Sequence, residues 1–181
     1  SGLTPWIPIY KMTLDGDNKA DKSIYRTSID EMHTLRVAEN LYISKDYVYD
    51  IYDTIMKSPL KDKVYKYSDL GFYFIPKIVE SLTNKSFESY LTENFFTPLN
   101  LNHTCFRPLF YHDKDNIVPT ENDTYFRMQL LCGDVHDQTA ALFGGVSGHA
   151  GLFSNAKDLA VMMQLLLDGG YANGRQFISE E

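Results

Sequence analysis

Three apolar runs between residues 44 and 98, each ended or interrupted by a proline, most constrain what this chain can fold into. In the first run the apolar residues fall at helical spacing and define one face, made of Val48, Ile51, Tyr52 and Ile55. A proline within a helix removes a backbone donor and clashes with the preceding turn. We therefore expect helices that end at Pro59 and Pro98, and a kink or break in the second run just before Pro76. Asn100, just after Pro98, suits a left-handed turn conformation.

Short polar side chains mark where helices are expected to begin. Ser44, Ser86 and Asn155 each precede an apolar run, and such side chains accept hydrogen bonds from the first helical N–H groups. The run after Asn155 is closed by a pair of glycines, which suit the end of a helix. The second helix is expected to begin near Ser68 or Asp69 and to turn its apolar residues inward: Leu70, Phe74, Ile78, Val79 and Leu82.

The remaining segments carry weaker patterns. Residues 1–43 are expected to be irregular, and residues 102–133 to form loops with short strands. A short helix is expected from 136 to 143 with Asp137 as its cap, followed by a glycine-rich loop at Gly144, Gly145 and Gly148. The predicted fold class is mainly α with a few short strands, in a single domain over residues 1–181.

The composition excludes several classes of function. The chain has 181 residues, of which 44% are hydrophobic and 23% charged, as in an ordinary globular domain. Its formal net charge of −7 argues against a nucleic-acid partner, which requires a basic surface. The apolar stretches are far shorter than the roughly 20 residues that span a membrane, so we expect no membrane span. Cys105 and Cys132 can pair or remain free thiols, and the sequence leaves both open.

Metal binding also lacks a sequence pattern. The five histidines are scattered, and a zinc site needs three or four converging ligands. Asp15, Asp17 and Asn18 resemble the start of a calcium loop, but Lys19 and Ala20 stand where that loop requires an oxygen ligand and a glycine. We therefore expect no metal and no cofactor.

The stretch Tyr67-Ser68-Asp69-Leu70-Gly71-Phe72 carries the strongest functional signal. It lies at the head of an amphipathic run, where a tyrosine and an aspartate can be presented at the mouth of a cleft. It resembles the Tyr-x-Asn motif of the serine β-lactamase and penicillin-binding protein superfamily, in its class C and esterase-like branch. In that superfamily the tyrosine assists proton transfer for a serine nucleophile. Asp69 stands at the asparagine position, and an ionised aspartate cannot donate the N–H bonds of a carboxamide.

Further segments resemble the same superfamily in the same order along the chain. They are the helical run from 86 to 91, the segment 96–104 with Asn100 at the usual glycine, the glycine loop 144–154 and the pair Asp158-Leu159. Ser1-Gly2-Leu3 resembles the loop that follows the nucleophile helix. The resemblance implies the helical lobe of the α+β β-lactamase/transpeptidase-like fold, lacking most of the central sheet.

The acyl-serine mechanism of this superfamily also needs a Ser-x-x-Lys turn and a third motif on a strand. Ser58 begins a Ser-x-x-Lys match but follows a helix, nine positions before Tyr67. Ser154 begins another, but it comes after the tyrosine motif. His149-Ala150-Gly151 has the letters of the third motif but lies between a glycine loop and a capped helix. We therefore expect the nucleophile upstream of this chain and the third motif downstream of it.

The resemblance implies a function and a set of site residues. We expect a fragment of a serine hydrolase that acts on β-lactams, cell-wall peptides or esters, in the periplasm or secreted, and that is inactive alone. The alternative is a non-catalytic binding module of the same fold, fused to another enzyme such as a glycoside hydrolase, so whether the chain is an enzyme stays open. The implied residues are Tyr67 and Asp69 for catalysis, and Ser68, His136, His149 and Gly148 for substrate binding.

Two further points follow from the residues. An α/β-hydrolase that uses Ser147 is rejected, because Gly145-Val146-Ser147-Gly148-His149 lacks the last glycine of the nucleophile elbow. A lobe separated from its sheet exposes apolar surface, so we expect self-association.

Overall fold

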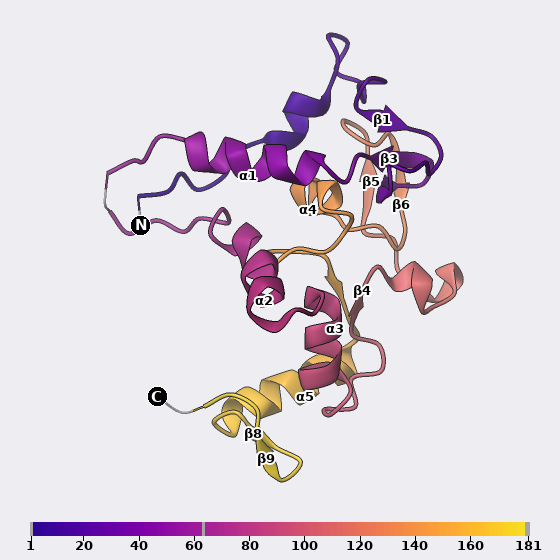
Figure 1. Cartoon of the computed structure of the whole chain (residues 1–181). Coiled ribbons are helices and arrows are strands. Elements are labelled where there is room, and N and C mark those ends of the chain that lie inside the picture. The colour runs from indigo at the N-terminus through magenta and orange to yellow at the C-terminus, as the bar shows by residue number, and fades with distance from the viewer. Residues whose placement is uncertain (1, 63, 180–181) are drawn as a thin grey trace. The chain divides into compact units, whose positions relative to one another are not determined.

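The structure is a computed structural model that describes residues 2–62 and 64–179 (Figure 1). The chain divides into two compact units. Unit 1 contains the residues up to Pro76 together with Arg107–Gly151, and unit 2 contains Lys77–Phe106 together with the residues from Leu152 onward. Both units are therefore built from two segments that are distant in the sequence. The prediction of a single domain stays a prediction.

Unit 1 contains a small antiparallel sheet near the start of the chain. Strand β3 (Leu41–Ile43) pairs with β1 (Tyr25–Arg26) on one side and with β2 (Leu35–Ala38) on the other. Asn40, in the turn between β2 and β3, has the positive φ of 53° that a tight hairpin turn needs. The expectation that residues 1–43 are irregular is therefore wrong for these strands. They have two to four residues each, too few for apolar and polar residues to alternate visibly.

Helix α1 (Tyr47–Lys57) follows the sheet and ends just before Pro59, as expected. Its cap residue is Asp46 and not Ser44, because Ser44 Oγ accepts the N–H of Asp46 at 3.2 Å, one residue before the helix. Ile51 and Ile55 on the predicted face are buried. They join a core with residues of the sheet and of α4 (Gln138–Leu142), a short helix that packs against β2.

The second predicted helix is split in two. Residues Phe72–Phe74 form the 3₁₀ helix η2, and α2 (Ile75–Thr83) begins directly afterwards. Pro76 is thus the second residue of α2, where its missing N–H costs nothing. The expected break before Pro76 is confirmed. The inward orientation of Ile78 and Leu82 is wrong, since these residues are 50% and 79% exposed.

A buried ion pair stabilises the other segment of unit 1. Arg127 lies between β5 (Glu121–Asp123) and β6 (Gln129–Leu131), and its Nε donates to Asp123 Oδ2 at 2.7 Å. Both side chains are fully buried. The same guanidinium donates to the carbonyl oxygens of Val135 and His136, each at 2.7 Å. Arg127 therefore holds the backbone that leads directly into α4. The two 3₁₀ helices that precede β5 are η4 (Pro108–Phe110) and η5 (Lys114–Asn116), and η1 (Ile9–Thr13) lies near the start of the unit.

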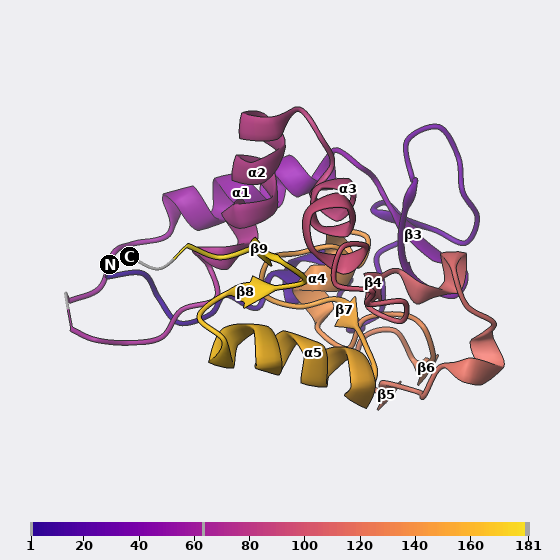
Figure 2. The ribbon, with the colours of Figure 1, turned by 90° about the horizontal axis from the view of Figure 1, so that it is seen from below.

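Unit 2 is a small helical assembly with its own core of Phe96, Leu99, Leu101 and Leu165. Figure 2 shows the hairpin of β8 and β9 beside α5, which contacts β8. Strand β4 pairs with β7 in the same unit. The elements are α3 (Phe87–Leu91), the π-helical turn η3 (Thr92–Phe96), β4 (Cys105–Phe106), β7 (Leu152–Phe153), α5 (Ala156–Leu167), β8 (Tyr171–Ala172) and β9 (Arg175–Gln176).

The predicted caps of unit 2 are confirmed. Ser86 Oγ accepts the N–H of Ser89 at 3.2 Å at the start of α3, and Asn155 Oδ1 accepts the N–H of Asp158 at 2.8 Å at the start of α5. Asn100 has the predicted left-handed conformation, with φ of 58°. The helices and the few short strands agree with the predicted fold class, while the missing central sheet stays a prediction.

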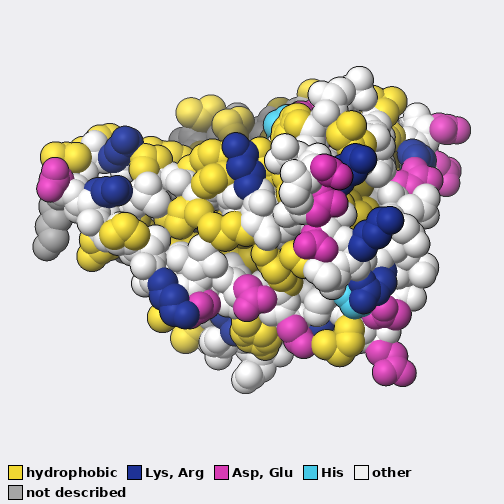
Figure 3. Space-filling model, turned by 90° about the horizontal axis from the view of Figure 1, so that it is seen from above, with side chains coloured by type: hydrophobic (Ala, Val, Ile, Leu, Met, Phe, Trp, Pro, Cys, Tyr) yellow, Lys and Arg dark blue, Asp and Glu magenta, His cyan; other side chains and the backbone are white. Residues whose placement is uncertain are grey.

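Further expectations concern cysteines, metals and membranes. Cys105 and Cys132 are free thiols. Within residues 2–62 and 64–179, no three side chains of the metal-binding types converge, and no helix is both long and apolar enough to cross a membrane. The face in Figure 3 shows acidic, basic and apolar side chains interspersed.

Candidate active site

The Tyr67-Ser68-Asp69 stretch forms a turn that presents its tyrosine to solvent. Tyr67 is 62% exposed, and its hydroxyl donates a hydrogen bond to Asp69 Oδ1 at 2.9 Å. The Tyr67 ring stacks on Phe72, with ring centroids 6.1 Å apart. The two residues predicted to be catalytic are therefore in direct contact, and an aromatic side chain from the next turn supports the tyrosine.

The turn is anchored to the first residues of the chain. Ser68 Oγ donates to the carbonyl oxygen of Thr4 at 2.7 Å, and the N–H of Asp69 donates to that of Pro5 at 3.1 Å. Ser68 is thus half-buried and ties the turn down, in addition to its predicted role in substrate binding. A hollow of about 270 Å³ adjoins this anchor, and Lys61 and Lys66 contribute to its lining. The other lining residues are Gly2, Leu3, Thr4, Pro5, Asp62 and Val64.

Asp69 also sets the proton affinity of the tyrosine. Its hydrogen bond and its negative charge raise the pKa of Tyr67 above the ordinary value for a phenol. A phenolate beside a carboxylate is disfavoured because two negative charges repel. The asparagine of the related motif carries no such charge. The substitution at this position therefore favours a Tyr67 that keeps its proton.

His149 lies inside unit 1, and both of its ring nitrogens have partners. Nε2 is 2.9 Å from Asp137 Oδ1, and Nδ1 is 2.8 Å from Ser147 Oγ. The His149 side chain is 3% exposed. Its ring packs against that of Tyr73, with centroids 4.2 Å apart. A direct contact between His149 and substrate would require this arrangement to open.

Gly148 packs tightly on the segment that follows the tyrosine motif. A Cβ at this position would lie 2.3 Å from the carbonyl oxygen of Phe72, and 3.1 and 3.2 Å from side-chain carbons of Ile75 and Pro76. Glycine is therefore required here because the two backbones meet. The glycine loop and the tyrosine motif, separated by more than 70 residues in the sequence, are neighbours in unit 1.

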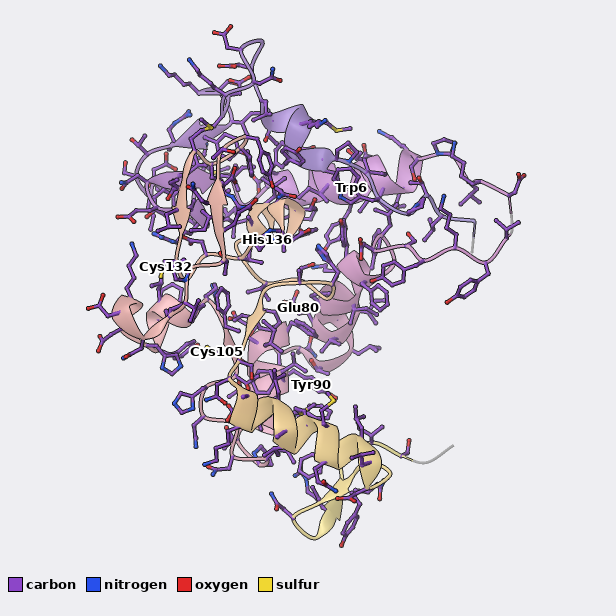
Figure 4. The ribbon with its side chains drawn as sticks, turned by 180° about the vertical axis from the view of Figure 1, so that it is seen from behind. Trp6, Glu80, Tyr90, Cys105, Cys132 and His136 are labelled. Carbon is purple, nitrogen blue, oxygen red and sulfur yellow. The ribbon has the colours of Figure 1, made fainter. Side chains whose placement is uncertain are left out.

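His136 is placed differently from the other predicted residues. Figure 4 shows it next to α4, and its side chain is 62% exposed. Its Nε2 lies 3.6 Å from Glu121 Oε2, and its carbonyl oxygen accepts from Arg127. The structure thus connects His136 with the β5–β6 hairpin, while Tyr67, Ser68 and Asp69 form one turn and Gly148 packs on the segment that follows it.

The contact among Asp137, Ser147 and His149 is the feature that sequence reasoning missed. The sequence predicts Asp137 only as a helix cap, and it does cap α4 by accepting the N–H of Ala140 at 2.7 Å. The sequence presents Ser147 only as a rejected nucleophile. The signal in the sequence is a glycine-rich segment in which Ser147 and His149 flank Gly148. Nothing in the local sequence indicates that Asp137, ten residues before Ser147, contacts this segment.

The two rejected serines lie in structural positions. Ser58 Oγ donates to the carbonyl oxygen of Ile55 at 2.7 Å, at the end of α1. In unit 2, Ser154 Oγ lies 2.8 Å from Thr104 Oγ1, just before α5. The Ser58 hydroxyl thus bonds to the backbone of a helix terminus, which is a usual role of serine, and the Ser154 hydroxyl bonds to a threonine just before β4.

The fold and the tyrosine turn agree with a comparison to known families. The family model described as Beta-lactamase matches residues 29–180. The chain belongs to this family. The resemblance inferred from the tyrosine motif and the ordered segments around it is thereby confirmed, at the level of the serine β-lactamase and penicillin-binding protein superfamily.

Similar proteins include curated bacterial relatives. A protein of Escherichia coli (strain K12) named "Putative D-alanyl-D-alanine carboxypeptidase" is 38% identical over 130 residues, which cover 64% of this chain and 29% of that protein. A protein of the same name from Salmonella schwarzengrund (strain CVM19633) is 36% identical over 144 residues, covering 69% and 33%. This chain therefore spans about a third of the length of these relatives. The octameric penicillin-binding protein homologue from Pyrococcus abyssi matches with 19% identity and a TM-score of 0.48, over 73% of this chain and 28% of that one.

Proposed function

We propose that this chain is the part of a β-lactamase-family serine hydrolase that carries its tyrosine motif. The observation that carries the proposal is the solvent-facing Tyr67, hydrogen-bonded to Asp69 at 2.9 Å within a turn anchored on residues 4 and 5. In such a hydrolase a serine supplied from outside these 181 residues attacks the substrate carbonyl and displaces the leaving group. Water then hydrolyses the acyl-serine intermediate, which releases the acid and regenerates the serine. The missing nucleophile and third motif make this chain inactive alone.

Tyr67 acts as the proton-relay residue in this proposal. A group that transfers protons must lie within hydrogen-bond reach of the reacting atoms, and Tyr67 is presented at the surface where a nucleophile can approach. Asp69 raises the pKa of the Tyr67 phenol, so Tyr67 stays protonated between turnovers. Tyr67 would therefore act by relaying a proton and not as a base that is permanently ionised. Asp69, Ser68 and Gly148 border the place where the substrate amide would lie. His136 remains a proposed substrate-binding residue, and His149 would bind substrate only if its hydrogen bonds to Asp137 and Ser147 opened.

The proposed substrates are β-lactams, cell-wall peptides or small esters. The printed name of the E. coli relative, a carboxypeptidase for D-alanyl-D-alanine, favours a peptide that ends in D-alanine. We also propose a periplasmic or secreted location, because cell-wall peptides lie there. Lys61 and Lys66 beside the tyrosine turn would attract the carboxylate of such a peptide.

The second candidate is a non-catalytic binding module of the same fold, fused to another enzyme such as a glycoside hydrolase. The observation in its favour is Asp69, whose carboxylate replaces an amide donor and holds the Tyr67 proton. The loss of the amide donor and the retention of the Tyr67 proton both weaken the acyl-serine mechanism of the family, and neither disturbs the tyrosine turn.

The test is covalent labelling by a fluorescent penicillin, applied to this chain and to a longer version that includes the flanking sequence of the parent gene. We expect the longer version to be labelled at a serine outside the 181 residues, and the chain alone to show neither labelling nor nitrocefin hydrolysis. Labelling of the chain alone would contradict the predicted inactivity. A longer version that carries a Ser-x-x-Lys turn and is not labelled would favour the binding module.

A pair of tyrosine variants tests the relay role. In the longer version Tyr67→Phe should slow acylation by roughly 10²–10⁴-fold, the usual contribution of general acid–base catalysis. Tyr65→Phe is the matched control, because Tyr65 is fully exposed two residues away in the same loop. Equal rates for both variants would remove Tyr67 from the mechanism.

We further propose that the chain alone self-associates. Leu159, Met163 and Leu166 form an apolar stripe along α5 and are 50%, 54% and 56% exposed. Such a stripe is normally covered by another surface. Light scattering should show a mass that rises with concentration, and Met163→Glu should reduce it, whereas Met56→Glu on α1 should not. A monodisperse monomer at every concentration would contradict self-association.

A further inference from the structure

We propose that Asp137, His149 and Ser147 form a hydrogen-bonded array whose role is to position Tyr67, with the buried His149 side chain as its central positioning residue. The part about catalysis rests on the proposed function, because it assumes that Tyr67 relays a proton. The part about geometry does not, since every contact in it lies within unit 1.

The array has a defined arrangement of protons. Asp137 is an acceptor when ionised, so the hydrogen bond of 2.9 Å to His149 places a proton on Nε2. A neutral imidazole then has an acceptor at Nδ1, and the Ser147 hydroxyl donates to it over 2.8 Å. Each of the three side chains thus satisfies the next, and the two buried members, His149 and Ser147, have their polar atoms satisfied, which favours a rigid network.

Asp137 is suited to remain ionised at the end of this array. Burial raises its pKa, but the hydrogen bonds from His149 and from the N–H of Ala140 outweigh burial, and the pKa lies below its ordinary value. The same carboxylate oxygen caps α4. Asp137 therefore ties the His149 loop to the start of a helix whose residues are buried in the core.

The array reaches Tyr67 through two contacts that lie side by side. The His149 ring packs on Tyr73, and Gly148 meets the carbonyl of Phe72 with no room for a side chain. Phe72 in turn stacks on the Tyr67 ring, and its N–H donates to the carbonyl oxygen of Asp69 at 2.8 Å. Moving His149 would therefore disturb the packing of Tyr73 and Phe72, and with it the positions of Tyr67 and Asp69.

The same three residue types also form catalytic triads, so the alternative must be weighed. A nucleophilic serine needs a hydroxyl that substrate can reach. Ser147 is 3% exposed and the His149 side chain is equally buried. The array faces the interior, against Tyr73, and this favours positioning over nucleophilic attack.

The test measures the titration of the Tyr67 phenol by NMR in protein labelled with ¹³C at tyrosine Cζ, with Tyr67→Phe to assign the signal. In the unmodified chain the Tyr67 pKa should lie above its ordinary value, because Asp69 is held beside it. His149→Ala should lower the midpoint by roughly half a pH unit or more, as the Tyr67–Asp69 contact loosens. His149→Gln, which retains a donor for Asp137, should recover part of the change.

The matched control is His33→Ala. His33 forms another histidine–aspartate pair of unit 1, with Nδ1 2.9 Å from Asp30 Oδ2, and lies outside the array. This variant should leave the Tyr67 titration unchanged. If His149→Ala lowers the melting temperature of a folded protein without moving the Tyr67 midpoint, His149 is merely structural and the proposal is wrong.

A second variant and a labelling experiment complete the design. Should His149→Ala fail to fold, Ser147→Ala decides the question, because it deletes only the last hydroxyl of the array; an unchanged Tyr67 midpoint there overturns the proposal. Labelling of Ser147 by a fluorophosphonate would also overturn it, in favour of a nucleophile. None of these measurements requires turnover, so failure of the longer version to bind penicillin would leave their outcome intact.

Discussion

Asp69 shows how a single residue can keep the geometry of a motif while changing its chemistry. The carboxylate accepts the Tyr67 hydroxyl over 2.9 Å and raises the pKa of the phenol. An asparagine in the same place would present an uncharged oxygen and two N–H donors. The sequence indicated the lost donors, and the structure adds that the tyrosine proton is held.

Gly148 offers a residue-scale prediction that has a control in the same unit. Gly148→Ala should destabilise the chain by about 1–3 kcal/mol, the usual cost of overpacking, because the new methyl would lie 2.3 Å from Phe72 O. Gly71→Ala should be neutral or stabilising by about 0.4–1 kcal/mol, since Gly71 has helical dihedral angles and open space around it. Urea unfolding of both variants checks this; equal stability would mean that the two backbones are not in contact.

At the scale of elements, the break before Pro76 explains a wrong prediction. A 3₁₀ helix has about 3.0 residues per turn and an α-helix 3.6, so residues on either side of a junction no longer share one face. Leu70 precedes the junction and is fully buried, whereas Ile78 and Leu82 follow it and are exposed. The helical spacing across residues 70–82 was real, but it extended over the turn at Leu70 and two helices with different numbers of residues per turn.

Helix α5 allows an element-scale test of a cap. Asn155→Ala removes the acceptor for the Asp158 N–H and should cost about 1 kcal/mol. Hydrogen exchange of the first α5 amides should speed up accordingly. Asn116→Ala, at an exposed position of unit 1, should leave these amides unchanged. Unchanged exchange in Asn155→Ala would mean that the cap contributes nothing.

At the scale of the whole molecule, the buried carboxylate of Asp123 and the half-buried carboxylate of Asp137 predict acid sensitivity. Burial raises the pKa of Asp123, but hydrogen bonds from Arg127 and from backbone N–H groups lower it below the ordinary value. Burial also raises the pKa of Asp137, and hydrogen bonds from His149 and from the N–H of Ala140 lower it below the ordinary value. A carboxyl group with a lowered folded pKa stabilises the protein above its unfolded pKa, about 3.9, and loses this effect as pH falls toward the folded value. The urea midpoint should therefore be steady from pH 7 to about 5 and fall below about 4. A midpoint that is the same at pH 3 and pH 6 would contradict this.

The sequence permitted good prediction of what depends on a few neighbouring residues. The end of α1, the caps Ser86 and Asn155, the left-handed Asn100 and the break before Pro76 all follow from such local chemistry. The strands of unit 1 escaped prediction because two to four residues carry too little periodicity. The tyrosine turn was found because its letters occur in order with other segments of the family.

By itself, therefore, the sequence determined the end of α1, the caps of α3 and α5, the break before Pro76 and the family, since caps, prolines and ordered motifs act or are recognised along the chain. Only the tertiary structure decided that Gly148 meets Phe72 and that Asp137, His149 and Ser147 join in one hydrogen-bonded array. The physical reason is that burial and hydrogen bonding between distant segments depend on how the chain packs. The letters around Asp137 and Ser147 are the same whether or not both side chains bond to His149.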